Sequence, residues 1–538
     1  MRRIQANCIF AVAIAAAVAL AGSFPAARAN AAPRSKHSQG ERLGSVNFPI
    51  SCTPEAQATF NAGVALLHSF QYQEAEQTFS QVGQQDPTCA MAYWGKAMSL
   101  YHQLWDWPSD DTLKEGHTDT MEAQKLRAKT EQERMYIVAA GVFFQDNPKL
   151  SKASRIKAYS DFMGKVFTKY PDDVNAGAFY ALSLITLQGK KEDQDANRKQ
   201  AIEILDGLFR TAPENPGVAH YLIHASDTPE LAPEGLEAAR AYAKIAPDSS
   251  HALHMPSHIF VRLGLWQEAI DSNIAAAAAA AEATKAGTAD ASYQFHALDF
   301  LDYAYLQSGQ AAKARAIVDE AKDVAGASAG DIAERQAFFM ARNAFELHQW
   351  KEAAALAVPE NSGAVEITYF VKTVGTARSG DATGAEQNFA KYKEAIASSA
   401  GKQTARYDVA SSDTIGEQEA EGWVAFAEGK DSEAMTAMRA AAAQEEKEGV
   451  DSLSTPAREM LGDMLLEMKN PAEALVEYKA ALVESPNRFD GLYGAAQAAE
   501  LSGKTEEAHK YYAKLVEICG AGGDRQELTQ AREEVAKK

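Results

Sequence analysis

The chain has 538 residues, of which 46% are hydrophobic and 23% are charged, and its formal net charge is −20 at pH 7. Without any basic stripe to offset this acidity, nucleic acids and anionic membrane surfaces are poor candidates for partners. A single hydrophobic core rarely serves more than about 250–300 residues, so the length favours several domains or an array of stacked repeats.

The N-terminus has the features of a secretory signal. Two arginines at positions 2 and 3 precede an apolar run over residues 9–21, and Ala27-Arg28-Ala29 offers a small-x-small cleavage site. We therefore expect residues 1–29 to be a signal peptide and residues 30–50 to be a flexible segment. The mature chain is then expected to be periplasmic or secreted.

No later stretch is predicted to cross a membrane. A spanning helix needs about 20 consecutive apolar residues. The longest candidate, the alanine run over residues 275–281, is short and is flanked by Asp271 and Glu282. We interpret this run as part of an extended helix of a repeat.

A pattern of small and aromatic residues recurs at about 34 residues along the rest of the chain. It is carried first by Gly63, Ala75, Phe79 and Pro87, and near the C-terminus by Gly462, Ala474, Tyr478 and Pro486. This pattern resembles the tetratricopeptide repeat, and the chain looks like a secreted bacterial tetratricopeptide-repeat protein. The resemblance implies an all-α, right-handed superhelical solenoid of helix-turn-helix repeats. The many alanines and other good helix formers agree with it.

The repeats are expected to form two parts. Residues 51–399 would form an array with a histidine-rich groove, and residues 415–522 would form the C-terminal repeats, with a linker between them. Residues 523–538 would be a C-terminal tail.

Two cysteines flank the first repeat. Cys52 lies just before its first helix, and Cys89 lies at the start of the next repeat. In an oxidising compartment they are well placed to form a disulfide that staples the N-terminal cap. Cys519 is then left over, and we expect it to be a buried packing residue.

Four histidines recur in the same repeat frame. His220 and His224 are followed 34 residues later by His254 and His258. Residues four apart lie on one side of a helix, and the resemblance implies that these positions face the concave groove of the array. Pro256 separates the second pair and is expected to kink that helix or to loosen its first turn.

Further polar residues are predicted to face the same stretch of groove. They are His251 in the repeat of the second pair, and His296, Asp299 and Tyr303 in the following repeat. Imidazoles at i and i+4 are a common helical metal pair, and pairs on neighbouring helices can converge on one divalent ion. Such a site suits zinc, copper(II) or nickel, with zinc or copper favoured, and the carboxylate of Asp299 or Asp227 could orient a histidine by accepting a hydrogen bond from its second nitrogen.

Several functions remain open. The main hypothesis is a periplasmic binding or assembly protein that holds zinc or copper in its groove. One alternative is a protein-interaction scaffold that binds a protein or peptide partner in the groove, where the histidines recognise a carboxylate or only pack. The other is a metal-dependent enzyme, in which Tyr303 or Asp299 assists a metal-activated water. No nucleophile elbow, phosphate loop or paired catalytic carboxylate supports the enzyme, so we favour it least.

Overall fold

A computed structural model describes residues 42–538 apart from 105, 361, 400–412 and 538. All regular structure among these residues is helical, which confirms the predicted all-α class. The predicted signal peptide and most of the predicted linker lie outside the described residues. No helix within the described part is long and apolar enough to cross a membrane.

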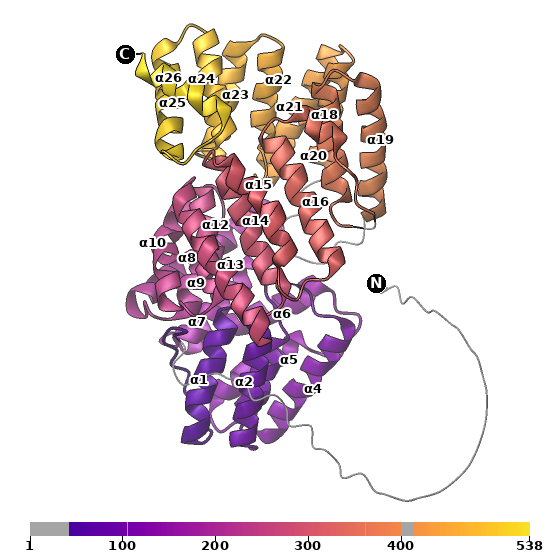
Figure 1. Ribbon diagram of the computed structural model, residues 1–538. Helices are drawn as coiled ribbons and strands as arrows, with labels where there is room; N and C mark the ends of the chain where they lie inside the picture. Colours follow the sequence, from indigo (N-terminus) through magenta and orange to yellow (C-terminus); the bar gives the residue numbers. More distant parts are fainter. Residues whose placement is uncertain (1–41, 105, 361, 400–412, 538) are drawn as a thin grey trace, which may run out of the picture.

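The N-terminal part of the solenoid is drawn in indigo and purple in Figure 1. Its helices are α1 (Pro54–His68), α2 (Tyr72–Gln85), α3 (Ala90–Ser99), α4 (Asp110–Leu126), α5 (Glu131–Phe143), α6 (Lys152–Lys169), α7 (Val174–Ile185) and α8 (Lys191–Thr211). Consecutive helices pack against each other as antiparallel pairs, which is the arrangement expected of helix-turn-helix repeats.

The middle part is drawn in magenta to salmon in Figure 1. It contains α9 (Pro216–Ser226), α10 (Ala232–Ile245), α11 (Ser250–His254), α12 (Pro256–Arg262), α13 (Trp266–Ala286), α14 (Ala291–Gln307), α15 (Ala311–Glu320), the 3₁₀ turn η1 (Ala321–Asp323) and α16 (Ala329–Glu346).

The C-terminal part is drawn in orange and yellow in Figure 1. It contains α17 (Trp350–Ala355), α18 (Val365–Arg378), α19 (Ala382–Ser399), α20 (Asp413–Ala427), α21 (Asp431–Glu448), α22 (Ala457–Glu467), α23 (Pro471–Glu484), α24 (Phe489–Leu501), α25 (Thr505–Cys519) and α26 (Gln526–Ala536). The predicted tail therefore forms a helix, α26, whose Leu528 and Ala531 are buried.

The small residues of the repeat pattern make room for its aromatic residue. A Cβ added at Gly63 would lie 2.8 Å from the ring of Phe79, and one added at Gly95 would collide with the same ring. Tyr478 is clasped in the same way by Gly462 and Gly494. In each case the aromatic side chain comes from the second helix of a repeat. It packs between the first helix of its own repeat and the first helix of the next repeat, and so holds the two repeats together.

Residues 42–50 belong to the packed array and not to a flexible segment as predicted. This extended stretch donates a hydrogen bond from the Ser45 N–H to the Glu214 carbonyl, at 2.8 Å. Phe48 is 3% exposed, and its ring lies 4.7 Å from that of Tyr136 and 5.3 Å from that of Trp94. An aromatic side chain that buries this much apolar surface holds the backbone around it in place.

The first repeat reaches back to the middle of the array. The turn between α1 and α2 contains Phe70, whose φ is +54°. The carbonyl of Phe70 accepts a hydrogen bond from the Tyr293 hydroxyl at 3.0 Å, and the Ser69 hydroxyl accepts one from Tyr242 at 3.1 Å. The turn thus occupies the concave side of the repeats formed by α9 to α14.

The C-terminal repeats dock onto the middle part through buried polar contacts. The Trp266 indole donates to the Asn487 carbonyl at 2.7 Å. The next residue, Arg488, donates to Glu346 and Glu459 and to the hydroxyl of Tyr303. Because an arginine with buried carboxylate partners is costly to separate from them, these contacts favour one fixed arrangement of the two parts.

Candidate metal centre

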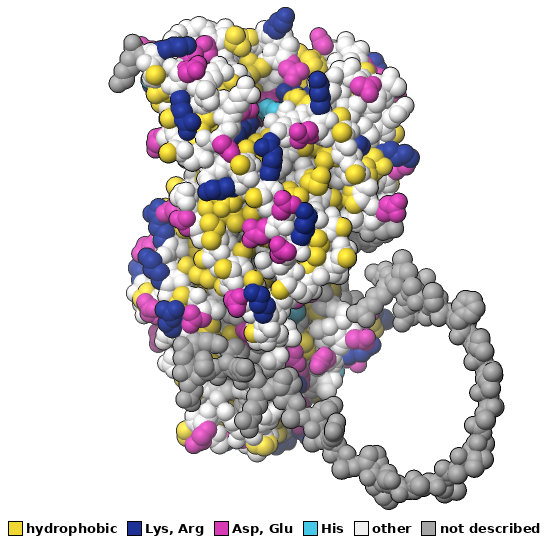
Figure 2. Space-filling view, in the orientation of Figure 1, with side chains coloured by type: hydrophobic (Ala, Val, Ile, Leu, Met, Phe, Trp, Pro, Cys, Tyr) yellow, Lys and Arg dark blue, Asp and Glu magenta, His cyan; other side chains and the backbone are white. Residues whose placement is uncertain are grey.

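Six of the predicted histidines gather inside the molecule. They are His220 and His224 on α9, His251 and His254 on α11, His258 on α12 and His296 on α14. His220, His251, His254 and His258 are buried, with at most 8% of their surface exposed, and His224 and His296 are partly buried. Very little histidine is visible on the face shown in Figure 2, where acidic and basic side chains are interspersed.

The histidines do not line an open groove, so that prediction is wrong. The α1–α2 turn covers His220, His224 and His251. The ring of Phe70 lies 4.4 Å from the ring of His220 and 5.5 Å from the rings of His224 and His251. The groove is closed because the solenoid winds back far enough for its first repeat to fill the space beside α9 and α11.

The six side chains form two groups. The α9 triad consists of His220, His224 and His251, and the α12 triad consists of His254, His258 and His296. Within each triad the candidate ligand atoms all lie within 4.8 Å of one another. Each triad combines an i, i+4 pair with one histidine of the following repeat. The sequence suggested one ion between the two pairs, whereas the structure separates the pairs into two sites.

In the α12 triad, hydrogen bonds at Nδ1 fix the orientation of two rings, those of His254 and His258. Asn273 donates from its amide to the Ala269 carbonyl at 2.8 Å, so its side-chain oxygen accepts the Nδ1–H of His254, at 2.7 Å. The Nδ1–H of His258 donates to the Asp227 carboxylate at 2.9 Å. In a neutral ring with its proton on Nδ1, Nε2 carries a lone pair. The two Nε2 atoms face each other at 3.1 Å.

Asp227 stays ionised inside the protein. Burial by itself would raise the pKa of this carboxyl group, but Arg262 and His258 outweigh that effect and hold the pKa well below its ordinary value. Arg262 donates from Nε to the second carboxylate oxygen at 2.9 Å. An ionised acceptor fixes the tautomer and orientation of a ligating histidine and makes the ring a better donor to metal.

The α9 triad contains an unpaired nitrogen. Nδ1 of His220 donates to the His68 carbonyl at 2.6 Å, which leaves its Nε2 unprotonated and 3.0 Å from Nε2 of His251. Nε2 of His224 is buried without a hydrogen-bond partner. Burial lowers the pKa of His220 to about 3 and also lowers the pKa values of His224 and His251, so the rings are neutral at physiological pH. Neutral imidazole is the form that binds metal.

The helix break at Pro256 shapes the α12 triad. Helix α11 ends at His254 and α12 begins at Pro256, with Met255 between them. This confirms the predicted interruption, because proline has no N–H to continue the helical ladder. The rings of His254 and His258 lie 5.1 Å apart and nearly perpendicular, at 84°, so that their nitrogens converge.

Asp299 and Tyr303 do not join either triad. The carboxylate of Asp299 lies 2.7 Å from the guanidinium of Arg342, which neutralises its charge. Tyr303 is 1% exposed and contacts Arg488. Both predictions assumed that Asp299 and Tyr303 share the face of His296. The residues of α14 that contact the histidines are His296 and Phe300, whereas Asp299 and Tyr303 face Arg342 and Arg488.

Other parts of the centre had no local sequence signal. The carbonyl of His68 and the side chain of Asn273 fix two of the rings, yet they lie 152 and 19 residues from the histidines that they contact. Only the position of Asp227, three residues after His224, hinted at such a role.

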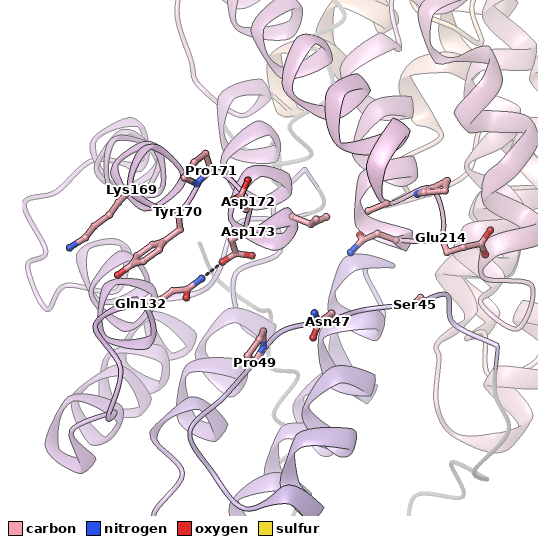
Figure 3. A pocket seen from close by; sticks show the side chains of 14 residues that line it. Ser45, Asn47, Pro49, Gln132, Lys169, Tyr170, Pro171, Asp172, Asp173 and Glu214 are labelled. Carbon is pink, nitrogen blue, oxygen red and sulfur yellow. Dashed lines mark hydrogen bonds between the residues drawn. The ribbon is translucent and has the colours of Figure 1, made fainter.

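An open cavity of about 540 Å³ lies elsewhere, beside the N-terminal segment. Figure 3 shows Asn47 and Pro49 on one side of it and Tyr170, Asp173 and Glu214 on the others. Asp173 accepts from Gln132 at 2.6 Å and caps α7, so its carboxylate already has a structural task. No histidine lines this cavity.

Comparisons with known proteins do not identify a function for the site. No protein-family model and no curated protein matches the chain. A structure of the human IFIT1 dimer with m7Gppp-AAAA is 13% identical, with a TM-score of 0.38 over 85% of this chain and 95% of IFIT1. The TPR domain of P58(IPK) is 13% identical, with a TM-score of 0.21 over 90% of this chain and 99% of that domain. Nothing about the histidines is inferred from these structures.

Proposed function

We propose that this chain is an exported repeat protein that binds a transition-metal ion, copper or zinc, in its buried histidine cluster. The observation that carries the proposal is the pair of Nε2 atoms of His254 and His258, which face each other at 3.1 Å while both Nδ1 atoms donate to oxygen acceptors. Two lone pairs at this distance repel each other. A cation between them removes the repulsion.

The dimensions of the α12 triad suit such an ion. Zinc–nitrogen bonds of about 2.0–2.1 Å in a tetrahedral site place two ligand atoms about 3.3–3.4 Å apart. The nitrogens of His254 and His258 already approach this separation, and His296 supplies a third ligand atom within 4.8 Å. Small rotations of the rings complete the coordination.

A purely structural histidine network is the competing account. It requires a proton between the two Nε2 atoms of the α12 triad, and therefore a second N–H on one ring. Such an imidazolium would lie inside the protein, where a charge is costly. A metal ion also brings a charge into the protein, but it gains three coordinate bonds.

The repeat fold itself supports a scaffold or assembly role, and we propose that partners bind the outer surface. The concave side near the histidines is occupied by the α1–α2 turn, as the contacts of Phe70 show. Export is supported by the signal-like N-terminus and by the Cys52–Cys89 disulfide. The metal would then serve the partner or stabilise the array.

Metal analysis of the purified full chain, without an affinity tag, tests the proposal. Wild-type protein should retain copper or zinc after dialysis, and His258→Ala should weaken binding at the α12 triad by at least about 100-fold, because it removes one of three ligands. His509→Ala on α25 is the matched control and should bind as wild type does. Wild-type protein that takes up neither metal in a titration would refute the proposal.

A further inference from the structure

We infer that the α9 triad binds a second ion and that the two triads together form a binuclear copper(I) centre. This inference rests on the proposed function and extends it from one site to two. It also assigns the metal and its oxidation state.

The first step is the α9 triad itself. A buried nitrogen that lacks a hydrogen-bond partner is uncommon in a folded protein, and Nε2 of His224 is in that state. The neighbouring Nε2 of His220 is unprotonated, because Nδ1 of the same ring donates to a carbonyl. The lone pair of His220 and the unpartnered nitrogen of His224, both on α9, together with His251 on α11 form a site that a cation would complete.

The second step is the proximity of the two triads. The rings of His224 and His258 lie 6.1 Å apart, and those of His251 and His254 lie 6.2 Å apart. Thus the two triads are in ring-to-ring proximity through two histidine pairs. Asp227 extends from the end of α9 to His258, so one short segment carries a ligand of the first triad and orients a ligand of the second.

The third step is the charge. All six candidate ligands are imidazoles, and no carboxylate or thiol of the described residues joins either triad. Asp227 is already paired with Arg262, and Arg198 brings a further positive charge to the His224 carbonyl, at 2.7 Å. Two divalent ions would add four positive charges to a buried site without a balancing anion, which is strongly unfavourable. Two copper(I) ions add half as many.

The fourth step is the number of ligands. Each triad offers three imidazoles, two of them buried and one, His224 or His296, partly buried. Zinc with three protein ligands normally keeps a water as its fourth ligand, and copper(II) prefers a tetragonal arrangement. Copper(I) accepts three imidazoles in a trigonal arrangement without a further ligand. The triads therefore fit copper(I) better than either divalent ion.

Anaerobic titration of the full chain with copper(I), in competition with a copper(I)-specific chelator, tests the stoichiometry. We expect two equivalents in the wild type and one each in His224→Gln and His296→Gln. His509→Gln should bind two. Circular dichroism identifies variants that fail to fold, and the wild-type count does not depend on any variant.

X-ray absorption at the copper edge of the loaded protein tests the oxidation state and the ligands. Copper in the +1 state with three nitrogen ligands is the expected result. One copper per chain, or copper(II) with four or more ligands, would overturn the inference but leave the proposed function intact. A parallel zinc titration separates the two claims, because binding of zinc alone rejects copper(I), and binding of neither metal rejects both.

Discussion

At the scale of single residues, Asp227 has the most influence on the centre without being a ligand. Its carboxylate orients His258 and is held by Arg262. Asp299 is similar in type, since it is a largely buried carboxylate paired with an arginine, Arg342, but it contacts neither triad. The two residues therefore allow the effect on metal to be separated from the effect of losing a buried charge.

Asp227→Asn should weaken metal binding at the α12 triad by about 10–100-fold, because a neutral amide makes His258 a poorer donor. The measurement is a competition titration with zinc or copper. Asp299→Asn, the control, should leave the affinity unchanged although it also breaks a buried ion pair. Equal losses of affinity in both variants would mean that the effect is general destabilisation.

At the scale of elements, the carboxyl groups of Glu419 on α20 and Glu445 on α21 interact inside the C-terminal repeats. Burial raises the pKa of Glu445 to about 7, although the backbone N–H of Ala457, at the start of α22, donates to it at 2.9 Å. Burial and the proximity of Glu445 also raise the pKa of Glu419. These helices therefore pack best when the carboxyl groups are protonated.

This arrangement sets a pH dependence. A carboxyl group with a folded pKa of about 7 and an unfolded value of 4.5 binds its proton more tightly in the folded state. The stability it contributes is fully present below pH 4.5 and is lost as the pH rises through 7. Glu445→Gln should thus be more stable than wild type at pH 8, by up to about 3 kcal/mol, and nearly equal to it at pH 4.5.

Urea unfolding of the two proteins between pH 4.5 and 8 measures this difference. Glu446→Gln provides the control, because Glu446 is the next residue and pairs with Arg458 at the surface. Parallel pH profiles for wild type and Glu445→Gln would show that Glu445 does not ionise in this range.

At the scale of the whole molecule, the docking of the C-terminal repeats depends on the turn between α12 and α13. Gly264 in this turn has φ +63°, and its carbonyl accepts from the Asn487 amide at 3.2 Å. A Cβ at this position would lie 2.6 Å from Cβ of Asn487 and would collide with the carbonyl of Pro486. The close approach of two distant parts therefore requires glycine here.

Gly264→Ala should lower the free energy of unfolding by more than Gly287→Ala does. Both glycines have positive φ, so both alanines pay a strain of about 1 kcal/mol. Only at Gly264 is the space filled, whereas nothing lies within 4 Å of a Cβ at Gly287. We expect an additional 1–3 kcal/mol at Gly264 from overpacking. Equal shifts of the thermal midpoint in the two variants would contradict the docked arrangement.

The disulfide acts on the same scale, because it ties the base of α1 to the start of α3. Cys52 and Cys89 are 37 residues apart, and closing a loop of this length stabilises a folded chain by about 2–4 kcal/mol. Cys52→Ser with Cys89→Ser should lose that amount in urea unfolding. In exported protein, mass mapping should find both cysteines oxidised, and free thiols would exclude the bridge.

The pattern of residues along the chain was sufficient to predict the repeats and the histidine pairs. A helix has a fixed period, so His220 and His224 had to share a face of α9 wherever that helix packed. His254 and His258 have the same spacing, although a break at Pro256 separates their helices. The same is true of the aromatic residue that fits beside the glycines of its repeat, as Phe79 does beside Gly63. These are local properties that depend on neighbours within about one repeat.

The tertiary structure decided how these pairs are grouped and whether solvent reaches them. The winding of the solenoid brings Phe70 and the His68 carbonyl onto α9 from about 150 residues away, and this contact closes the groove. It also pairs Asp299 with Arg342 and leaves Asp227 beside His258. No local pattern encodes the contacts of Phe70 and His68, because they depend on the accumulated rotation of every repeat between the partners. The pairs made by Asp227 and Asp299 span about one repeat, and the packing of neighbouring helices selects them.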